Sequence, residues 1–473
     1  MSAMEPVIGL EIHAQLNTAT KLFCSCPASS GDEPNSHVCE VCTGQPGALP
    51  RLNAKAVELA ALAGLALGCR ISEVSVFSRK NYFYPDLPNG FQTSQLDPPI
   101  CLGGGLEIGN GKYIRLNRIH LEDDAGKCIH DEQRGQTLVD LNRAGTPLIE
   151  IVTEPDLASA EEVMEFLKKL HGILVRLGVT VGRLEEGEFR CDVNISLRPV
   201  GSTLLGTRSE IKNLNSFRHA GQAIEYEIVR QGGLYAAGED LLQETRLFDP
   251  ARLETRSLRS KEEAHDYRYF PQPDLPVVLA PAELQARLKA GMPELPEQIR
   301  ERLSSQGLSE EQAAVLLDRR QAVEYYDAME AELKDAKRSA ALMVELLLPA
   351  CQREGLEPFE SKLKPVDLAR LGRLMADNTL SRRAAYDLFP ELFEKGGDPE
   401  ELAKSKGVLQ VSDSGTIAAL AAGVIAAHPD EAQKYKEGQE KILSFFVGQV
   451  MKKSKGAANP KLAGELLAEL LKK

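Results

Sequence analysis

The sequence predicts an α+β protein in which an antiparallel-sheet domain is followed by an all-α domain and a small helical tail domain. Roughly the first 290 residues hold segments in which apolar and polar side chains alternate, separated by Gly/Pro turns. After about Glu294, glycine becomes sparse, helix-forming residues dominate and the alternation largely disappears. We therefore expect domains at residues 1–292, 293–406 and 407–473.

Composition and charge restrict the class of protein. The chain has 473 residues, of which 43% are hydrophobic and 26% charged, as in an ordinary globular protein. A net charge of −13 argues against a protein dominated by non-specific nucleic-acid binding, although it leaves room for a local basic surface. The first residues lack the pattern of a signal peptide, and the most apolar stretch, 59–69, is too short to span a bilayer. We expect a cytoplasmic protein with no membrane association and with reduced cysteines.

Acidic residues and a histidine recur on the polar sides of the predicted strands. In residues 10–16 (LEIHAQL), Glu11 and His13 share one face and lie roughly 7 Å apart along the strand. Similar acidic faces occur in residues 121–127, 148–152, 191–197 and 209–217. The candidate catalytic residues are Glu11, His13, Glu122, Asp123, Glu150, Asp192 and Glu210.

These polar faces have two interpretations. A single strand of this kind is usually just the solvated face of an antiparallel sheet. Several such faces rich in Glu, Asp, Asn and His instead suggest Mg²⁺ and phosphate binding, because Mg²⁺ prefers oxygen ligands and completes its shell with water and phosphates. The candidate Mg²⁺ ligands are Glu11, His13, Asp123, Glu150, Asp192 and Glu210.

Four cysteines form two closely spaced pairs. Cys24 and Cys26 are followed, after twelve residues, by Cys39 and Cys42. Two such pairs joined by a turn-rich loop predict a tetrahedral structural Zn²⁺ site. The alternatives are isolated reduced thiols or a redox pair formed by Cys39 and Cys42.

Arginine, lysine and tyrosine side chains near the predicted strands are candidates for nucleotide binding. Arg79, Lys80 and Tyr82 open the loop RKNYFYPDLP and are suited to contact a phosphate or a nucleoside. Arg143 follows one predicted strand, and Arg190 precedes Asp192. The alternative is a packed loop and arginines paired in turns, with Arg143 on Asp140. The sequence contains neither a P-loop nor a Gly-x-Gly-x-x-Gly motif after a strand.

Helical periodicity is clearest at residues 158–177, where Ser159 is the expected N-cap. Asn459 before Pro460 predicts a second capped start. The other expected helices cover 54–67, 220–231, 310–334, 337–348, 365–377, 381–388, 414–427, 439–453 and 460–472.

The C-terminal segment is locally basic. Residues 434–473 contain nine lysines and four glutamates. Lys452, Lys453 and Lys455 cluster at the end of a predicted helix, where they are candidates for contacts to nucleic-acid phosphates. Lysines also suit a helix C-terminus without any ligand, so both interpretations stay open.

Several of these segments together resemble the family of B subunits of aspartyl/glutamyl-tRNA amidotransferases. The similar segments are GLEIHAQL, RKNYFYPDLP, HLEDDAGK, DLNRAGTPLIEI, RCDVNIS, SEIKNLNSF, DYRYFPQPDLP and VGQVMKKSKGAANP, in the family's order and from about Val7 to the C-terminus. One difference is that Asp123 stands where the family often has a second glutamate, which could alter how a metal is held.

The resemblance implies a glutamine-synthetase-like catalytic sheet, a helical domain and a tail that meets tRNA. It implies a ligase that phosphorylates the side-chain carboxylate of Glu-tRNA(Gln) or Asp-tRNA(Asn) with ATP and Mg²⁺ and then amidates it with ammonia. The implied partners are an amidase (glutaminase), which is the A subunit of the same complex, a small C subunit and misacylated tRNA, and the implied zinc is structural. The alternatives are a non-catalytic tRNA-binding scaffold and a free-standing ligase that acts on a small carboxylic acid.

Overall fold

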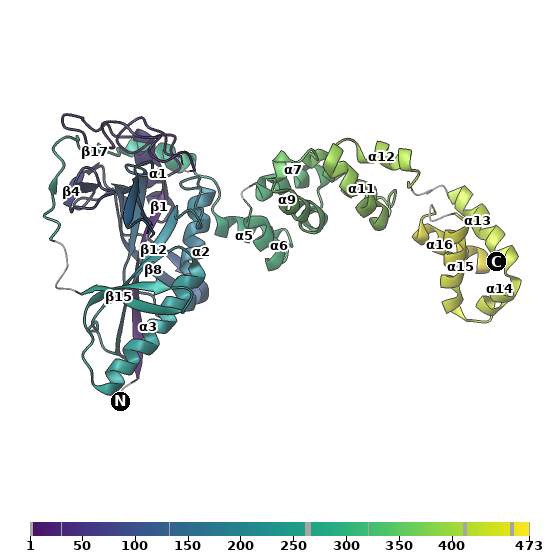
Figure 1. The fold of residues 1–473 in the computed structure, drawn as a ribbon. Coiled ribbons are helices and arrows are strands. Elements are labelled where there is room, and N and C mark those ends of the chain that lie inside the picture. The colour runs from purple at the N-terminus through teal and green to yellow at the C-terminus, as the bar shows by residue number, and fades with distance from the viewer. Residues whose placement is uncertain are drawn as a thin grey trace. The chain divides into compact units, whose positions relative to one another are not determined.

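The chain folds into two compact units, Met1–Pro296 and Glu297–Lys473 (Figure 1). The computed structural model describes residues 3–29, 31–131, 133–260, 266–319, 321–409, 414–454 and 458–472. Each unit is considered separately below.

The first unit is built on a ten-stranded, mainly antiparallel sheet. Only the pairing of β13 with β14 is parallel among the neighbouring strands described. In sheet order the strands are β15 (Glu254–Ser260), β14 (Glu244–Asp249), β13 (Ser209–Leu214), β12 (Phe189–Pro199), β1 (Met4–Gln15), β11 (Pro147–Thr153), β8 (Lys112–Asp123), β6 (Cys101–Leu102) and β2 (Arg70–Ile71), with β7 (Gly105–Ile108) also paired to β8. The predicted antiparallel sheet in an α+β protein is confirmed at this level.

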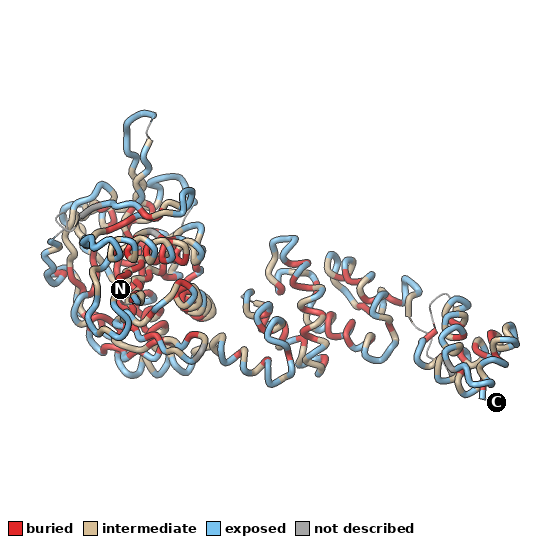
Figure 2. The backbone as a smooth tube through the Cα atoms, turned by 90° about the horizontal axis from the view of Figure 1, so that it is seen from below, coloured by how far each residue is buried: buried red, intermediate tan, exposed pale blue. Residues whose placement is uncertain are grey.

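One face of this sheet packs into the hydrophobic core of the unit. Leu10, Ile12 and Ala14 of β1 are fully buried, because alternate side chains of a strand point to the same face. The helices of this unit contribute to the same core and run beside the strands (Figures 1 and 2). They are α1 (Ala54–Ala66), α2 (Ala160–Arg176), α3 (Phe217–Ala237) and α4 (Ala282–Ala290). The opposite face of the central strands is therefore left for the polar side chains.

Three small sheets complete the first unit. They pair β9 (Lys127–Asp131) with β10 (Gln136–Asp140), β16 (Phe270–Pro271) with β4 (Ser78–Asn81) and β5 (Phe91–Ser94), and β17 (Val278–Leu279) with β3 (Val74–Ser75). The β16–β4–β5 sheet touches the end of β8, since Gln92 donates to the backbone oxygen of Asp123. This contact places the loop that begins at Arg79 near the polar face.

The second unit is all helical in its described residues. Its helices are α5 (Pro296–Ser305), α6 (Glu310–Leu317), α7 (Ala322–Leu333), α8 (Ala336–Leu342), α9 (Leu348–Glu354), α10 (Pro365–Ala376), α11 (Arg382–Lys395), α12 (Pro399–Lys406), α13 (Ser414–Ala427), α14 (Pro429–Lys436), α15 (Leu443–Lys453) and α16 (Pro460–Lys472), with a π-helical turn at Met343–Leu347. Two separate cores hold them, one within residues 299–403 and one within residues 417–471.

Helix boundaries show what local patterns predict. Ser159 caps α2 by accepting a hydrogen bond from the backbone N–H of Glu162, as predicted. The single helix predicted at 310–334 is wrong, because α6 ends at Leu317 and α7 begins at Ala322. The helix predicted to stop at residue 388 continues to Lys395 with Pro390 inside it, because packing outweighs the proline signal there.

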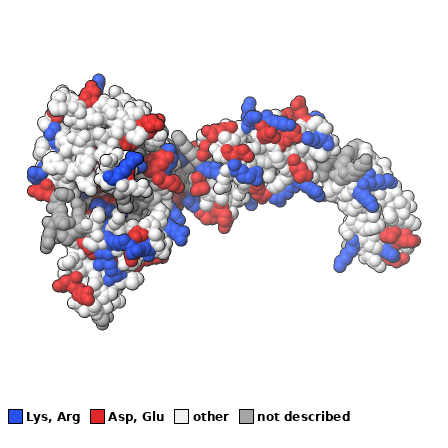
Figure 3. All heavy atoms as spheres, in the orientation of Figure 1, with Lys and Arg blue, Asp and Glu red and all other residues white. Residues whose placement is uncertain are grey.

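The surface charge of the helical unit and the length of the helices complete the description of the fold. Acidic and basic side chains are interspersed over helices α5–α12 in the view of Figure 3. Within the described residues, every helix falls short of the length and apolar character needed to cross a membrane.

Candidate active site

The polar face of the sheet brings distant acidic residues together. Five neighbouring strands, in the order β13–β12–β1–β11–β8, carry them. In the antiparallel register, Glu11 lies opposite Asp192, and His13 lies opposite Glu150. Because adjacent strands are about 4.8 Å apart, side chains on this face form two contiguous groups.

The first group consists of His13, His120, Glu122 and Glu150. His13 Nε2 lies 3.3 Å from Glu122 Oε1 and 3.4 Å from Glu150 Oε2. His120 Nε2 lies 3.6 Å from Glu122 Oε2 and 3.4 Å from Glu150 Oε2. The two carboxylates are thus bracketed by the two imidazoles, and Ser94 of β5 donates to Glu122 at 3.4 Å.

The charges in this group stabilise one another. Burial lowers the pKa of His13, but hydrogen bonds to Glu122 and Glu150 outweigh it and raise the pKa to about 10. The same carboxylates raise the pKa of His120 to about 9 against burial. Burial and Glu150 act to raise the pKa of Glu122, yet the two imidazoles bring it to about 2. Glu122 is therefore a carboxylate at neutral pH.

The second group consists of Glu11, Asp192 and Glu210, with Lys212 among them. Lys212 Nζ lies 2.8 Å from Asp192 Oδ2 and 2.5 Å from Glu210 Oε1. Asn194 donates to Glu11 Oε1 at 3.0 Å. Burial, followed by the charge of Glu150, raises the pKa of Glu11, so this carboxylate lacks full compensation from its protein neighbours.

Both groups have the geometry and the donor atoms of a cation site. Ligand atoms of His13, Glu122 and Glu150 lie within 4.8 Å of one another, as do those of Glu11, Asp192 and Glu210. Carboxylate oxygens suit Mg²⁺. Buried polar atoms without a hydrogen-bond partner also occur here, namely His13 Nδ1, His120 Nδ1 and Asn194 Oδ1. Buried polar atoms normally have partners, so this face is suited to an additional ligand.

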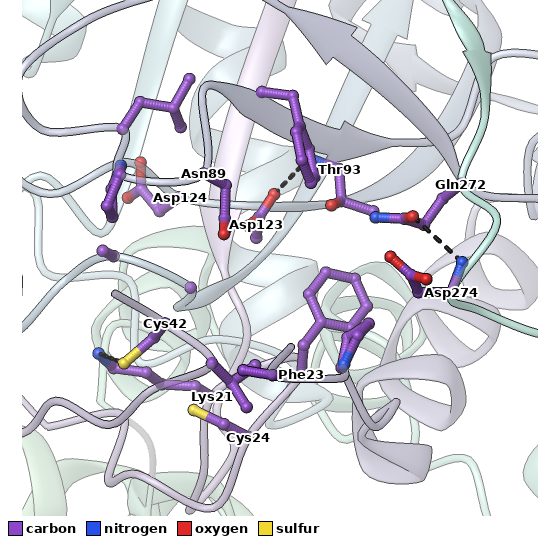
Figure 4. Close-up of a pocket in the computed structure, with 18 of the residues that line it drawn as sticks. Lys21, Phe23, Cys24, Cys42, Asn89, Thr93, Asp123, Asp124, Gln272 and Asp274 are labelled. Carbon is purple, nitrogen blue, oxygen red and sulfur yellow. Dashed lines mark hydrogen bonds between the residues drawn. The ribbon is translucent and has the colours of Figure 1, made fainter. Parts of the chain in front are cut away.

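Asp123 points away from these two groups. Its carboxylate accepts a hydrogen bond from the backbone N–H of Thr93 at 2.7 Å and lines a cavity of about 70 Å³ (Figure 4). Burial raises its pKa to about 8. The adjacent position, Asp124, lines the same cavity. Alternation along β8 explains why Glu122 and Asp123 lie on different sides.

Arg190 and Arg143 converge on Asp124. Arg190 Nη2 lies 3.1 Å from Asp124 Oδ1, and Arg143 Nε lies 3.6 Å from Asp124 Oδ2. Arg143 also donates to the backbone oxygens of Ala125 and Gly126. The structure therefore pairs Arg143 with Asp124 rather than with Asp140.

Strand β4 and the loop that follows it send their side chains in two directions. Arg79 pairs with Asp274 at 2.8 Å and lies over the ring of Phe91 at 4.1 Å. Lys80 Nζ lies 4.9 Å from the centre of the Tyr267 ring, and the charge of Glu122 raises the pKa of Lys80 against the effect of burial. Burial, followed by Glu122 and Asp123, raises the pKa of Tyr82. The charges of the acidic residues thus act on Lys80 and Tyr82, whereas Arg79 is held in a protein ion pair.

The four cysteines come together as the spacing predicts. Sulfur atoms of Cys24, Cys26, Cys39 and Cys42 lie within 4.8 Å of one another. A hydrogen bond with Cys24, assisted by the ammonium of Lys21, lowers the pKa of Cys42 to about 4 against the effect of burial. Four sulfur donors at these separations fit a structural Zn²⁺.

Lys21 is a fully buried lysine beside this cysteine group. Its Nζ donates to the backbone oxygen of His37 at 2.8 Å, to that of Leu141 at 3.2 Å and to Cys42 Sγ at 3.5 Å. Figure 4 shows Lys21, Cys24 and Cys42 on one side of the cavity that Asp123 and Asp124 line on the other.

The lysines of the C-terminal segment are placed only in part. Lys452 and Lys453 are exposed at the end of α15. Lys455 lies outside the described residues.

Four residues that were not among the candidate site residues contact them: His120, Asp124, Asn194 and Lys212. His120 and Glu122 are two residues apart on β8, and Asp192 and Asn194 are two apart on β12. The two-residue period places His120 and Asn194 on these acidic faces, but the sequence alone gave no reason to select them as site residues. No local pattern identifies Asp124, whose contacts come from Arg143 and Arg190.

Comparison with known proteins gives a consistent result. Residues 6–285 match the GatB/GatE catalytic domain family, and residues 324–471 match the GatB domain family. The chain is 51% identical over 476 residues to the B subunit of the aspartyl/glutamyl-tRNA(Asn/Gln) amidotransferase of Nitratidesulfovibrio vulgaris strain DP4, covering all of both chains. It is 48% identical over 475 residues to the corresponding B subunit of Myxococcus xanthus, covering all of this chain and 99% of the relative.

Proposed function

We propose that this chain, which belongs to the family of aspartyl/glutamyl-tRNA(Asn/Gln) amidotransferase B subunits, uses its polar sheet face for the ATP-dependent step of a tRNA-dependent amidation. The chain is thus one component of a ligase complex that serves protein biosynthesis. The observation that carries the proposal is the pair of adjacent acidic groups on this face.

The proposed reaction has two steps. The side-chain carboxylate of Glu or Asp on a misacylated tRNA attacks the γ-phosphorus of ATP, which forms an acyl phosphate and releases ADP. Ammonia then attacks the acyl carbon, and phosphate leaves to give the amide. Phosphorylation is needed because an unactivated carboxylate has only oxide as its leaving group. Such phosphoryl transfer depends mainly on positioning and on neutralising charge.

Each of the two acidic groups is suited to hold a cation that neutralises part of the negative charge of the ATP phosphates. Glu122 and Glu150 would hold one Mg²⁺, with His13 as a further ligand once the cation displaces its proton, and Glu11, Asp192 and Glu210 would hold another. Bound Mg²⁺ would neutralise the polyphosphate. His120 keeps Glu122 and Glu150 ionised and oriented from the side opposite His13.

Of the polar and cationic side chains around these groups, Lys212, Lys80 and Tyr82 would contact the phosphates directly. Lys212 already contacts Asp192 and Glu210, which places its ammonium beside the second group. Lys80 and Tyr82 lie near Glu122, at the other end of the face. Arg190 and Arg143 would act mainly by holding Asp124. Asp123, which points into the neighbouring cavity, is better suited to supporting the end of β8 than to binding metal.

The test is ADP formation that requires misacylated tRNA in the assembled complex. Glu11→Ala and Glu150→Ala should each abolish it, whereas the glutaminase activity of the amidase partner should persist. The matched control is Glu107→Ala on β7, whose exposed side chain lies outside both groups. Full transamidation by both variants would refute the assignment.

The same measurement separates the two alternative functions. A scaffold protein would have no phosphorylation step to lose when Glu11 or Glu150 is replaced. A small-molecule ligase would form ADP without tRNA. Dependence on both the acidic residues and the tRNA supports only the proposed activity.

The remaining parts of the proposal concern a zinc site, the domain organisation and the partner subunits. Cys24, Cys26, Cys39 and Cys42 would hold a structural Zn²⁺. We further propose that the large sheet is glutamine-synthetase-like and that the domains are 1–292, 293–406 and 407–473. The expected partners are an amidase (the A subunit), a small C subunit and tRNA.

The tail would contact tRNA phosphates through Lys452, Lys453 and Lys455. Deleting residues 408–473 should weaken tRNA binding and reduce its salt dependence by about 0.7–0.9 log unit per phosphate contact. Catalysis should survive at saturating tRNA. An unchanged affinity and salt slope would mean that these lysines serve only the end of their helix.

A further inference from the structure

The loop between the two cysteine pairs is hydrogen-bonded to the end of β10 and to the turn that follows it. Asn35 of this loop donates from Nδ2 to the backbone oxygen of Val139 at 3.0 Å, and its Oδ1 accepts from the N–H of Leu141 at 2.8 Å. The N–H of Asn35 donates to Asp140 Oδ1 at 3.0 Å. One residue of the cysteine loop is thus joined to three consecutive residues of a segment about a hundred positions away in the chain.

Asn142, in the turn after β10, binds the cysteine loop in the reverse sense. Its Nδ2 donates to the backbone oxygen of Glu33 at 2.8 Å, and its Oδ1 accepts from the N–H of His37 at 2.8 Å. Asn142 is buried, and a buried amide left without partners is costly. Asn35 and Asn142 therefore form a reciprocal pair, in which each side-chain amide binds the backbone of the other segment. We call this pair the asparagine clamp.

The backbone of Asn35 is in a conformation that few residues adopt. Its φ is 60°, in the left-handed region, which favours glycine and tolerates asparagine better than most other residues. Glycine would fit this backbone but has no side-chain amide. Replacing Asn35 with glycine therefore removes one half of the asparagine clamp without straining the loop.

The turn after β10 holds Asp124 in place. The N–H of Asp124 donates to the backbone oxygen of Thr146 at 2.9 Å, and the N–H of Gly145 donates to the backbone oxygen of Asp124 at 2.8 Å. Arg143, in the same turn, has its Nε 3.6 Å from Asp124 Oδ2. Asp124 and Cys42 lie on opposite sides of the cavity in Figure 4, so the turn supplies the connection from the cysteine loop to Asp124.

Asp124 in turn orients Arg190. Arg190 Nη2 donates to Asp124 Oδ1 at 3.1 Å, and Gln15 Nε2 donates to Asp124 Oδ2 at 3.3 Å. Arg190 lies opposite His13 in the register of β1 and β12, and opposite residues of an antiparallel pair share one face. A carboxylate held by the turn therefore fixes a guanidinium on the face that carries the first acidic group.

We propose that Asn35 and Asn142 are positioning residues for the phosphorylation step. This inference rests on the proposed function. The asparagine clamp holds the turn, the turn holds Asp124, and Asp124 holds Arg190 on the face of His13. Phosphoryl transfer depends mainly on positioning and charge, so a small displacement of these groups lowers its rate. The cysteine loop thus contributes to catalysis as well as to the stability of the fold.

The test is Asn35→Gly in the assembled complex. The kcat of tRNA-dependent ADP formation should fall by about tenfold, whereas the KM for ATP and the KM for misacylated tRNA should each change by less than about threefold. Zinc content should not change, because all four cysteines remain. The matched control is Asn117→Ala on β8, an exposed asparagine whose amide binds Glu154 and which should leave kcat unchanged.

Two further measurements follow the path from the asparagine clamp to Asp124. Amide hydrogen exchange should become faster in Asn35→Gly at Leu141, whose acceptor is lost, and also at Asp124, which the turn holds. When Asn35→Gly is added to Asp124→Asn, kcat should fall by less than about threefold further, because both changes act through the same carboxylate.

The outcomes separate this inference from the proposed function. If Asn35→Gly does not fold or loses zinc, Asn142→Ala supplies the same comparisons from the other half of the clamp. Folded, zinc-containing variants with wild-type kcat, unchanged exchange at Asp124, or additive losses with Asp124→Asn would each overturn the inference. In that event the proposed function would still stand if Glu11→Ala abolishes ADP formation. Full activity in Glu11→Ala would instead refute the proposed function, and the exchange at Asp124 would still test the asparagine clamp.

Discussion

The acidic face and the cysteine group both gather metal-binding side chains, but they are assembled in different ways. The four cysteines come from one loop, between Cys24 and Cys42. The acidic groups come from five strands spread between Glu11 and Glu210. The first site is a property of a short sequence, and the second is a property of strand register.

The cysteine group and the acidic face also differ in how far neighbouring protein groups compensate their charges. A fully buried lysine, Lys21, donates hydrogen bonds to Cys42 Sγ and to the backbone oxygens of His37 and Leu141. On the acidic face, Glu11 has a raised pKa because burial and Glu150 are not fully offset. This contrast suggests a site closed by the protein itself and a face that requires its substrate and cations to be complete.

The largest expected effect tests whether the two sites are independent. Glu122→Gln removes a carboxylate held anionic at neutral pH, with a pKa of about 2. We expect ADP formation to fall by about 100-fold or more, since groups that hold transition-state charge have effects of that size. Zinc content, measured by elemental analysis, should not change. Glu107→Gln is the control, and loss of zinc in Glu122→Gln would show that the two sites are coupled.

The reverse experiment is Cys39→Ser. A four-thiolate site that loses one ligand should lose its zinc, which we expect at about one per wild-type chain. The thermal midpoint should fall by several degrees, because zinc binding contributes to folding. Cys128→Ser, outside the cysteine group, should change neither property. A metal-free wild-type protein that is fully stable under reducing conditions would contradict the zinc assignment.

Glu227, which lies outside both sites, is a buried carboxylate whose charge is compensated entirely by protein side chains. Glu227 is fully buried and is held by Arg230 at 2.8 Å and Arg246 at 3.0 Å. Burial acts to raise its pKa, but these arginines and other hydrogen bonds lower it below its ordinary value. Glu227→Gln should cost about 3–5 kcal/mol at pH 7, the usual result of breaking a buried pair.

The pH dependence of that cost follows from the lowered pKa. The stabilisation by Glu227 is present above the unfolded-state pKa of about 4.3 and is lost as the pH falls through the lower folded-state pKa. Chemical denaturation should therefore show a smaller difference between wild type and Glu227→Gln at low pH than at pH 7. The exposed Glu225→Gln on the same helix is the control. A difference that grows in acid would contradict this interpretation.

The smallest expected effect concerns Lys21. Lys21→Met keeps most of the buried volume but removes the ammonium that contacts Cys42. Zinc should then bind about 10–100-fold more weakly, as is typical when an outer hydrogen bond to a ligand is removed. Transfer of zinc to a competing chelator measures this, with the exposed Lys55→Met as the control. Unchanged transfer would mean that Lys21 only fills space.

The sequence alone determined the features that depend on neighbouring residues. The alternation in residues 10–16 predicted which face of β1 is buried, and Ser159 predicted the start of α2, because both depend on backbone period and local hydrogen bonds. The spacing of Cys24, Cys26, Cys39 and Cys42 predicted that they would meet, since a short loop limits their separation.

Only the tertiary structure decided which acidic residues share a site. Glu122 and Asp123 are adjacent in the sequence, yet Glu122 joins His13 and Asp123 hydrogen-bonds to Thr93. Strand register, which is fixed by pairing between segments more than a hundred residues apart, placed Glu150 opposite His13. Local patterns contain no information about such pairing, because it depends on how the whole core packs.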